Sequence, residues 1–312
     1  MPITLERAQN TSLGKVRLSR FGAHWFDRST GLNILLDEVA VPRASWSRAP
    51  RYASIALTNA CELRCPFCYA PKVPARLESD AVLSWAIELD HAGTLGIGFG
   101  GGEPTAHPEF ALICSEVARR TRMAVTFTTH GHRMTSGLAD ALRGSVHFIR
   151  VSMDGCGATY ERLRGRSFSE FARRVETIAT IAPFGFNVVV NDETVHELDA
   201  IEVFAAEVGA SEVLFLPEQP VGGRPGISAR ACERLTEWIL SRPTQMRLAI
   251  SEATVPDGVP IAQPFAGEAA LDAHVHLDAQ GILRPHAYAQ EGVPIATSVI
   301  DALDQLRSVV EK

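Results

Sequence analysis

An alternation of strand-like and helix-like segments runs through residues 52–242 and constrains the fold more than any other feature of this sequence. Short apolar segments each precede a longer segment with helical spacing. Parallel strands joined by crossover helices form one sheet, and six such units are too few for a closed eight-unit barrel. The sequence therefore predicts an α/β fold built on a partial (β/α)6 TIM-like barrel. The expected strands are 52–60, 96–104, 123–131, 147–155, 186–192 and 212–220, and the expected helices are 80–93, 107–120, 137–144, 167–182, 198–210 and 229–242.

The segments on either side of this repeat follow other patterns. Residues 15–38 predict a short N-terminal hairpin that turns at 28–31, followed by a connector. Beyond the last predicted helix we expect a small α+β extension. It would contain a strand at 246–253, a hairpin at 274–288 and a helix at 298–312. The expected division is 1–50 for the hairpin and connector, 51–243 for the barrel and 244–312 for the C-terminal extension.

Composition narrows the class of protein and its compartment. The chain of 312 residues has a net charge of −6 and no run of Lys or Arg, so we expect no nucleic-acid partner. No segment reaches the roughly 20 apolar residues of a membrane span, and residues 1–10 lack the features of a secretory signal. We therefore expect a cytoplasmic protein without a membrane partner. In that compartment its six cysteines indicate metal ligands or buried thiols rather than disulfides.

Residues of unusual type follow the predicted strands, at the points where those strands end. A cysteine-containing loop follows the first strand, and a glycine-rich segment, GGGEP at 100–104, ends the second. The segments THG at 129–131 and SMDG at 152–155 end the third and fourth. Since the carboxyl ends of parallel strands meet at one rim of such a sheet, we expect the functional site at that rim.

Three cysteines within eight positions offer a metal site with one ligand missing. They are Cys61, Cys65 and Cys68, in the spacing C-x3-C-x2-C. One interpretation is a zinc site completed by a remote His or Cys, because structural zinc takes four ligands. The other is a [4Fe–4S] cluster with one iron left open. An open iron can chelate the amine and carboxylate of S-adenosylmethionine.

With the aromatic Phe67 before its last cysteine, this motif resembles the signature of the radical SAM family, and the resemblance extends over about residues 50–220. It implies that Cys61, Cys65 and Cys68 hold a [4Fe–4S] cluster. The reduced cluster would cleave S-adenosylmethionine to a 5′-deoxyadenosyl radical, which abstracts a hydrogen atom from a substrate. It also implies an electron donor such as flavodoxin or ferredoxin.

The resemblance assigns cofactor contacts at several strand ends. Gly101, Gly102 and Glu103 match the family's GGEP segment, which would accept from the ammonium of the cofactor. Ser152 and Asp154 match its S-x-D pattern, which would hold the ribose hydroxyls and the methionyl end. The full set of expected cofactor contacts is Phe67, Gly101, Gly102, Glu103, Ser152, Asp154, Arg164, Asn191 and Leu216.

For Arg164, Asn191 and Leu216, an interpretation without a cofactor also remains open. Arg164 would pair with the cofactor carboxylate through its planar guanidinium, although Arg162 and Arg164 could equally be a solvated pair. Asn191 would contact the ribose and Leu216 would pack on the adenine. Both positions also suit ordinary turns at strand ends.

Five residues are candidates for the substrate side. His130 replaces the amide that many relatives carry after the third strand, and Glu218 and Gln219 follow the sixth. His286 and Tyr288 lie in the predicted C-terminal hairpin. Glu218 and His286 could orient a substrate or move a proton, while the alternative for all five is a rim or packing role.

The C-terminal extension resembles that of the SPASM and twitch subgroup, but without its cysteines. Gly281 and Pro285 match a pattern in which His286 stands where a cysteine would be. We therefore expect a shortened extension that carries no second cluster and covers the mouth of the barrel.

Three functions remain open at this point. We expect a radical SAM enzyme that acts on a small molecule or a short peptide in a biosynthetic pathway. The alternative is a radical SAM maturase that modifies a ribosomally made peptide. Outside the enzyme class, the chain could be a non-catalytic metal-binding scaffold, although a scaffold has no need of a cofactor pocket.

Overall fold

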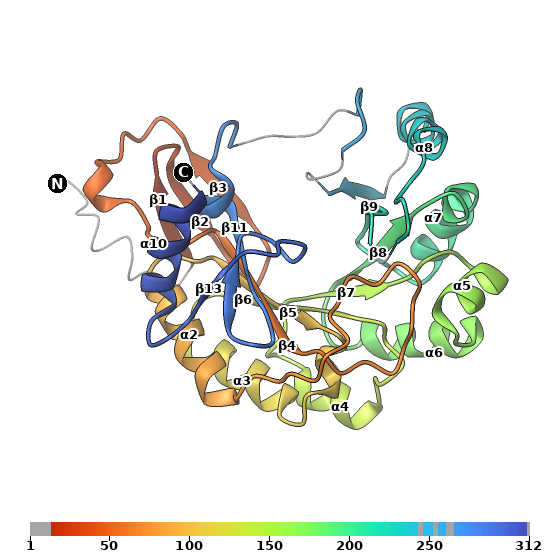
Figure 1. Cartoon of the computed structure of the whole chain (residues 1–312), viewed down its shortest axis with the longest axis horizontal. Helices are drawn as coiled ribbons and strands as arrows, with labels where there is room; N and C mark the ends of the chain where they lie inside the picture. The colour runs from red at the N-terminus through yellow and green to blue at the C-terminus, as the bar shows by residue number, and fades with distance from the viewer. Residues whose placement is uncertain (1–13, 222, 243–245, 252–254, 260–264, 311–312) are drawn as a thin grey trace.

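The computed structural model describes residues 14–310, apart from 222, 243–245, 252–254 and 260–264. It has an α/β fold with two sheets in the described part of the chain, one of three strands and one of ten (Figure 1). Residues 1–10, on which the expectation of no secretory signal rests, lie outside the described residues. No helix in the described part has the length and apolar character that crossing a membrane requires.

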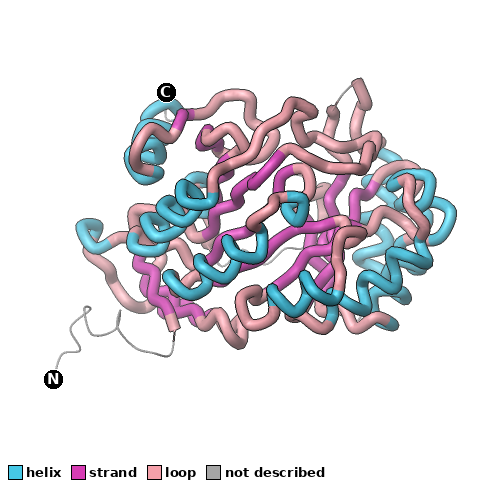
Figure 2. The backbone as a smooth tube through the Cα atoms, turned by 90° about the horizontal axis from the view of Figure 1, so that it is seen from below, coloured by secondary structure: helices cyan, strands magenta, loops and turns pink. Residues whose placement is uncertain are grey.

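Six parallel strands pair in chain order and form the barrel wall, as the sequence predicted. Helices cover the outer face of this wall (Figure 2). The strands are β4 (Tyr52–Thr58), β5 (Gly96–Gly101), β6 (Ala124–Thr129), β7 (Phe148–Ser152), β8 (Phe184–Val190) and β9 (Glu212–Pro217). The helices are α2 (Ser79–His91), α3 (Phe110–Arg120), α4 (Ser136–Leu142), α5 (Gly157–Arg164), α6 (Phe168–Ala179), α7 (Leu198–Glu207) and α8 (Ala229–Ser241).

Side chains alternate between the two faces of this wall. Ile55, Ile97 and Phe127 are at most 1% exposed and belong to the core that packs against the helices. Their neighbours Ser54 and Thr126 are half-buried and face the interior of the barrel. Successive residues of a strand point to opposite faces, so the pattern gives an apolar outer face and a polar inner one. The polar inner face can accept a polar ligand.

The helix α5 was absent from the sequence prediction. It ends at Gly165, whose φ of +66° lies in the left-handed region that glycine adopts most easily. This helix places Arg164 at its last position, so it is the element that positions a predicted cofactor contact.

The N-terminal segment forms three strands where the sequence predicted two. A turn at residues 20–21 splits the first predicted strand, and Gly22 follows it with φ of +108°. A Cβ at Gly22 would lie 2.1 Å from the carbonyl oxygen of Leu36, so this position requires glycine. The predicted turn at 28–31 does join the second and third strands. The strands are β1 (Lys15–Ser19), β2 (Gly22–Phe26) and β3 (Asn33–Leu36), and the 3-10 turn η1 (Arg43–Ser45) lies in the connector.

The C-terminal extension continues the barrel sheet at both edges. β10 (Arg247–Ile250) pairs in parallel with β9, and β11 (His274–Leu277) pairs in parallel with β4. Residues 252–253 of the predicted strand and 311–312 of the predicted helix lie outside the described residues. The division at residue 243 stays a prediction. The remaining elements are α9 (Ala270–Ala273), β12 (Ile282–Arg284), β13 (Val293–Pro294) and α10 (Val299–Val310), with the 3-10 turns η2 (Pro104–Ala106) and η3 (Thr194–His196) in the barrel.

Candidate active site

The loop that carries the three cysteines is clamped at its base. It leaves β4 and returns beside it, where the Asn59 amide donates to the Ala75 carbonyl at 3.0 Å and the Leu77 amide to the Leu57 carbonyl at 3.0 Å. Between these points Cys61, Cys65 and Cys68 are free thiols and half-buried. The cysteine loop, residues 59–76, is therefore fixed at both ends while its thiols stay accessible.

Two glycines let the cysteine loop cross the end of β5. The Gly102 amide donates to the Thr58 carbonyl at 2.7 Å. A Cβ at Gly101 would lie 2.2 Å from that same carbonyl oxygen, and a Cβ at Gly102 would lie 2.4 Å from the carbonyl oxygen of Ala60. Because neither residue has a Cβ, the backbone of the cysteine loop can pack against both. Their contact with a cofactor stays a prediction. Gly100, which the sequence analysis did not single out as a cofactor contact, has no atom within 4 Å of its Cβ position.

Glu103 ties the end of β5 to the end of β6. Its carboxylate is 1% exposed and accepts from the Thr105 amide at 3.2 Å and hydroxyl at 2.6 Å. It also accepts from the Thr129 hydroxyl at 2.7 Å and from the His130 amide at 2.9 Å. Protein donors therefore occupy both carboxylate oxygens, and the predicted contact with the cofactor ammonium stays a prediction.

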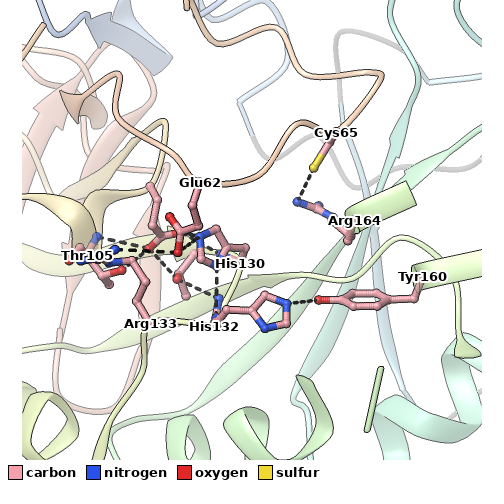
Figure 3. Close-up of polar contacts among 11 residues, drawn as sticks. Glu62, Cys65, Thr105, His130, His132, Arg133, Tyr160 and Arg164 are labelled. Atoms are coloured by element: carbon pink, nitrogen blue, oxygen red, sulfur yellow. Dashed lines mark hydrogen bonds and ion pairs between the residues drawn. The ribbon is translucent and has the colours of Figure 1, made fainter. Parts of the chain in front are cut away.

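His130 is buried beside the first cysteine, Cys61. Figure 3 shows it next to Glu62. Its Nδ1 accepts from the His132 amide at 3.1 Å, so the neutral ring carries its proton on Nε2. That Nε2 lies 3.4 Å from a carboxylate oxygen of Glu62 and 3.4 Å from one of Glu103. Each of three residues offers one atom that could bind a metal, and these three atoms lie within 4.8 Å of one another. The residues are Cys61, Glu62 and His130. The imidazole is thus held among carboxylates beside the cysteine loop.

Arg164 forms a buried ion pair with Asp154. It also donates to the sulfur of Cys65 at 3.5 Å (Figure 3). Burial raises the pKa of Asp154, and the Arg164 charge and the Val189 amide, at 2.7 Å, oppose that rise. Burial also raises the pKa of the Cys65 thiol, which Arg164 again opposes. The guanidinium lies 5.6 Å from the ring of Phe67. A buried cation beside a thiol favours the thiolate that a metal requires.

The alternative of a solvated arginine pair does not describe these residues. The Arg164 side chain is 10% exposed, whereas that of Arg162 is 57% exposed and pairs with Glu193. The two arginines therefore point to different surroundings.

Asn191 and Glu218 belong to one hydrogen-bond network. The side-chain oxygen of Asn191 accepts from the amides of Glu193 and Thr194, both at 3.0 Å, and its amide group donates to Glu218 at 2.8 Å. Glu218 is 4% exposed and also forms an ion pair with Arg224. Arg224 was missed by the sequence analysis, although a cation six residues after a carboxylate in a Gly- and Pro-rich loop was a visible signal.

Two further predicted contacts lie on the inner face near the strand ends. Ser152 is half-buried at the end of β7 and pairs with Asn187, and Leu216 is half-buried on β9 beside Val189. Gln219 donates to the Pro217 carbonyl at 3.1 Å, a local turn contact. These positions suit a ligand at the rim.

The C-terminal hairpin reaches the cysteine loop through an aromatic pair. The rings of Tyr288 and Tyr69 lie 4.6 Å apart, and the His286 ring lies 6.5 Å from that of Tyr288. His286 is exposed, and in the described residues it forms no hydrogen bond or ion pair with Glu218. The predicted pairing of Glu218 with His286 therefore stays a prediction.

Cationic side chains donate to the sulfurs of two of the three cysteines. Lys72 donates to the Cys68 sulfur at 3.3 Å, as Arg164 does to that of Cys65. Among the described residues, Cys61, Glu62 and His130 form the one close group of three metal-ligating atoms. Two of the other cysteines, Cys114 and Cys232, lie on helices of the outer layer. Two of the three thiols thus have a cationic neighbour, whereas Cys61 lies beside Glu62 and His130.

Residues 55–204 match the radical SAM superfamily. The chain is 30% identical over 171 residues to mycofactocin maturase MftC of Mycolicibacterium smegmatis, covering 52% of this chain and 43% of that protein. It is 32% identical over 167 residues to PqqA peptide cyclase of Gluconobacter oxydans, covering 50% and 46%. Each match thus spans under half the length of the curated relative.

Solved structures share the fold over a larger part of the chain. Streptococcus suis SuiB bound to S-adenosylmethionine has a TM-score of 0.72 at 14% identity, covering 94% of this chain and 87% of that one. The structure of anSMEcpe with bound AdoMet has a TM-score of 0.66 at 16% identity, covering 84% and 82%. At this identity the likeness establishes the fold alone.

Proposed function

Since the chain belongs to the radical SAM superfamily, we propose that it binds a [4Fe–4S] cluster and S-adenosylmethionine and modifies a precursor peptide. The family implies both groups, and the observation that carries the proposal is the convergence at one rim of three accessible thiols and a buried cation. Cys65 and Arg164 are 99 residues apart in the chain, yet their side chains are in contact. A metal-binding scaffold gives no reason for that cation or for the polar inner face.

The residues that would hold the cluster are Cys61, Cys65 and Cys68. When bound, the cluster and S-adenosylmethionine supply a one-electron reductive cleavage and the abstraction of a hydrogen atom from the substrate. Arg164 and Lys72 offset negative charge on the sulfurs of Cys65 and Cys68 through charge-assisted contacts. The Asp154 carboxylate holds the Arg164 guanidinium in place.

Residues of the strand ends would orient S-adenosylmethionine. Ser152 offers a hydroxyl at the end of β7, and Leu216 offers an apolar surface to the adenine on β9. Asn191 would act near the ribose, although its amide is already shared with Glu218. Gly101 and Gly102 would accept from the ammonium group through backbone carbonyls, because Glu103 is committed to protein donors.

A precursor peptide is the substrate class with the most support. PqqA peptide cyclase is named for a peptide, and one structure of SuiB is bound to precursor peptide SuiA. These relatives favour the maturase alternative over the small-molecule substrate that the sequence analysis put first. His130, Glu218, His286 and Tyr288 remain candidates for contacts on the substrate side.

Anaerobic reconstitution tests this proposal. We expect about four irons per chain, because the described extension offers no further cysteines. Dithionite and S-adenosylmethionine should then yield 5′-deoxyadenosine, and candidate precursor peptides should raise its rate and change in mass. Cys65→Ala should abolish both iron binding and product, while Cys232→Ala on α8 serves as the matched control.

Two outcomes would contradict the proposal in different ways. Zinc at the cysteines with no 5′-deoxyadenosine would favour the scaffold. Turnover stimulated by small molecules and by none of the peptides would leave the radical chemistry intact and make the substrate class wrong.

A further inference from the structure

A hollow of about 970 Å³ opens against the cysteine loop. It is lined by residues within 58–65 and 72–78 and by Ala106 and Pro108. We call it the loop hollow. Cys61 and Cys65 lie in its wall, whereas Ser152, Asp154, Arg164, Asn191 and Leu216 do not. The lining of the loop hollow therefore includes two of the cysteines and none of the expected contacts with S-adenosylmethionine.

The loop hollow carries an excess of positive charge. Arg64, Lys72 and Arg76 line it and are exposed, and Glu78 is the one carboxylate in its lining. None of the three cations forms an ion pair with a carboxylate in the described part of the chain. The protein as a whole has a net charge of −6 and only three lysines. The positive charge of the hollow is therefore opposite in sign to the net charge of the protein.

The nearest acidic residue of the loop does not cancel this charge. Glu62 lies instead beside His130 at 3.4 Å and Arg133 at 3.8 Å, and it is not part of the lining. Apolar surface accompanies the cations, since Val73 is 53% exposed and also lines the hollow. Cations without carboxylate partners around a small apolar area suit a brief contact with an acidic protein.

We propose that the loop hollow is the docking surface for an acidic one-electron carrier protein. This inference rests on the proposed function, in which one electron must enter the cluster for each cleavage. A carrier seated in the hollow would lie against the loop that holds the cluster ligands Cys61 and Cys65. It would lose one electron and the cluster would gain it, with no change in bonds to the carrier. Opposite charges would speed the encounter, and such redox contacts are typically small and weak.

Charge reversal at the two arginines tests the docking surface. The variant carries Arg64→Glu and Arg76→Glu, and leaves Lys72 unchanged because it contacts Cys68. The matched control carries Arg230→Glu and Arg234→Glu on α8, which are exposed, lack ion pairs with described residues and change the net charge by the same amount. The probes are a reduced flavodoxin and a reduced ferredoxin, both acidic. Stopped-flow absorbance follows cluster reduction, and titration with oxidised flavodoxin measures binding.

We expect the loop variant to be reduced at least about tenfold more slowly by both carriers at low ionic strength, because electrostatic steering accelerates association by roughly 10- to 1,000-fold. The difference should shrink as salt screens the charges. The control variant should match the wild type, and reduction by dithionite and 5′-deoxyadenosine formation with dithionite should be unchanged in all three proteins.

Other results separate this inference from the proposed function. Equal reduction and equal flavodoxin binding in the loop variant and the control would overturn the docking surface. A second outcome would also overturn it. If both carriers reduce the loop variant at the normal rate but the variant no longer binds an acidic peptide, the hollow is a substrate surface. Absence of 5′-deoxyadenosine with dithionite in the wild type would overturn the proposed function, while flavodoxin binding would still report on docking.

Discussion

The guanidinium of Arg164 donates to the sulfur of Cys65 at 3.5 Å (Figure 3), and it forms a buried ion pair with Asp154. One cation therefore connects the cysteine loop after β4 with the end of β7. The contact brings the cysteine loop and the end of a remote strand together.

Replacing Arg164 should destabilise the protein as well as impair its chemistry. Arg164→Ala leaves Asp154 buried without its partner, and breaking a buried pair typically costs about 3–5 kcal/mol. Urea unfolding of the cluster-free protein measures the free energy of unfolding. Arg162→Ala is the control, since that side chain is exposed and should change stability by less than about 0.5 kcal/mol. Equal effects of the two substitutions would mean that the Arg164–Asp154 pair contributes nothing to the fold.

Alanine at Gly102 should displace the cysteine loop. The new Cβ would lie 2.4 Å from the Ala60 carbonyl oxygen and 2.6 Å from that of Asn59, and both are backbone atoms. We expect iron content after reconstitution to fall by more than half, because the three thiols would no longer share one geometry. Gly100→Ala is the matched control, since its Cβ would enter open space. Full iron content in Gly102→Ala would show that the loop can shift without losing the cluster.

The amide variant of Glu103 should be destabilised although it keeps the shape of the side chain. A glutamine presents an NH2 group where the carboxylate now accepts from the Thr129 hydroxyl or the His130 amide. A buried donor left without an acceptor costs about 1–3 kcal/mol. The midpoint of urea unfolding should fall accordingly in Glu103→Gln and stay unchanged in Glu207→Gln, which alters an exposed residue of α7. A midpoint equal to the wild type would mean that the network rearranges at no cost.

Stability should depend on the protonation of His276 in acid. Burial first, and then the neighbouring His274, lower its pKa to about 4 from the ordinary value of 6.5. The folded state therefore binds fewer protons than the unfolded state between those values. Neutral His276 therefore makes its full contribution to the free energy of unfolding above pH 6.5. That contribution is lost as the pH falls toward 4, and the loss is at most about 3 kcal/mol.

The measurement is the free energy of unfolding of the wild type and of His276→Asn between pH 4 and 7.5. The asparagine can keep the contact with the Ser54 hydroxyl that His276 Nδ1 makes at 2.8 Å. The difference between the two proteins should change with pH, and the corresponding difference for the exposed His91→Asn should stay flat. A flat difference for His276→Asn would show that its imidazole titrates alike in both states.

The pair of Tyr288 and Tyr69 should restrain the cysteine loop. Their rings lie 4.6 Å apart, and such aromatic pairs contribute about 0.5–1.5 kcal/mol. Tyr288→Leu should speed hydrogen exchange of backbone amides in residues 66–72 by a few-fold, without changing exchange in α6. Unchanged exchange in the loop would mean that its clamp at Asn59 and Ala75 suffices.

Much of the architecture could be predicted from local patterns. The six barrel strands follow from alternating apolar positions such as Ile55 and Phe127, whose burial depends on the period of the strand itself. The cysteine motif needed only its own spacing. Helix α5 was missed because its capping glycine, Gly165, follows a stretch with little apolar periodicity. The three-stranded N-terminal sheet was missed because a two-residue turn before Gly22 splits what looks like one strand.

The sequence by itself determined the barrel, the rim at which the site lies and the three cysteines, because these depend on residue type and spacing within one segment. Only the tertiary structure decided the partners of the site residues. It committed Glu103 to Thr129 and His130, joined Glu218 to Asn191 and Arg224, and set Arg164 against Cys65. Such pairings depend on which strand ends and loops come together when the sheet closes, and no local pattern encodes that geometry.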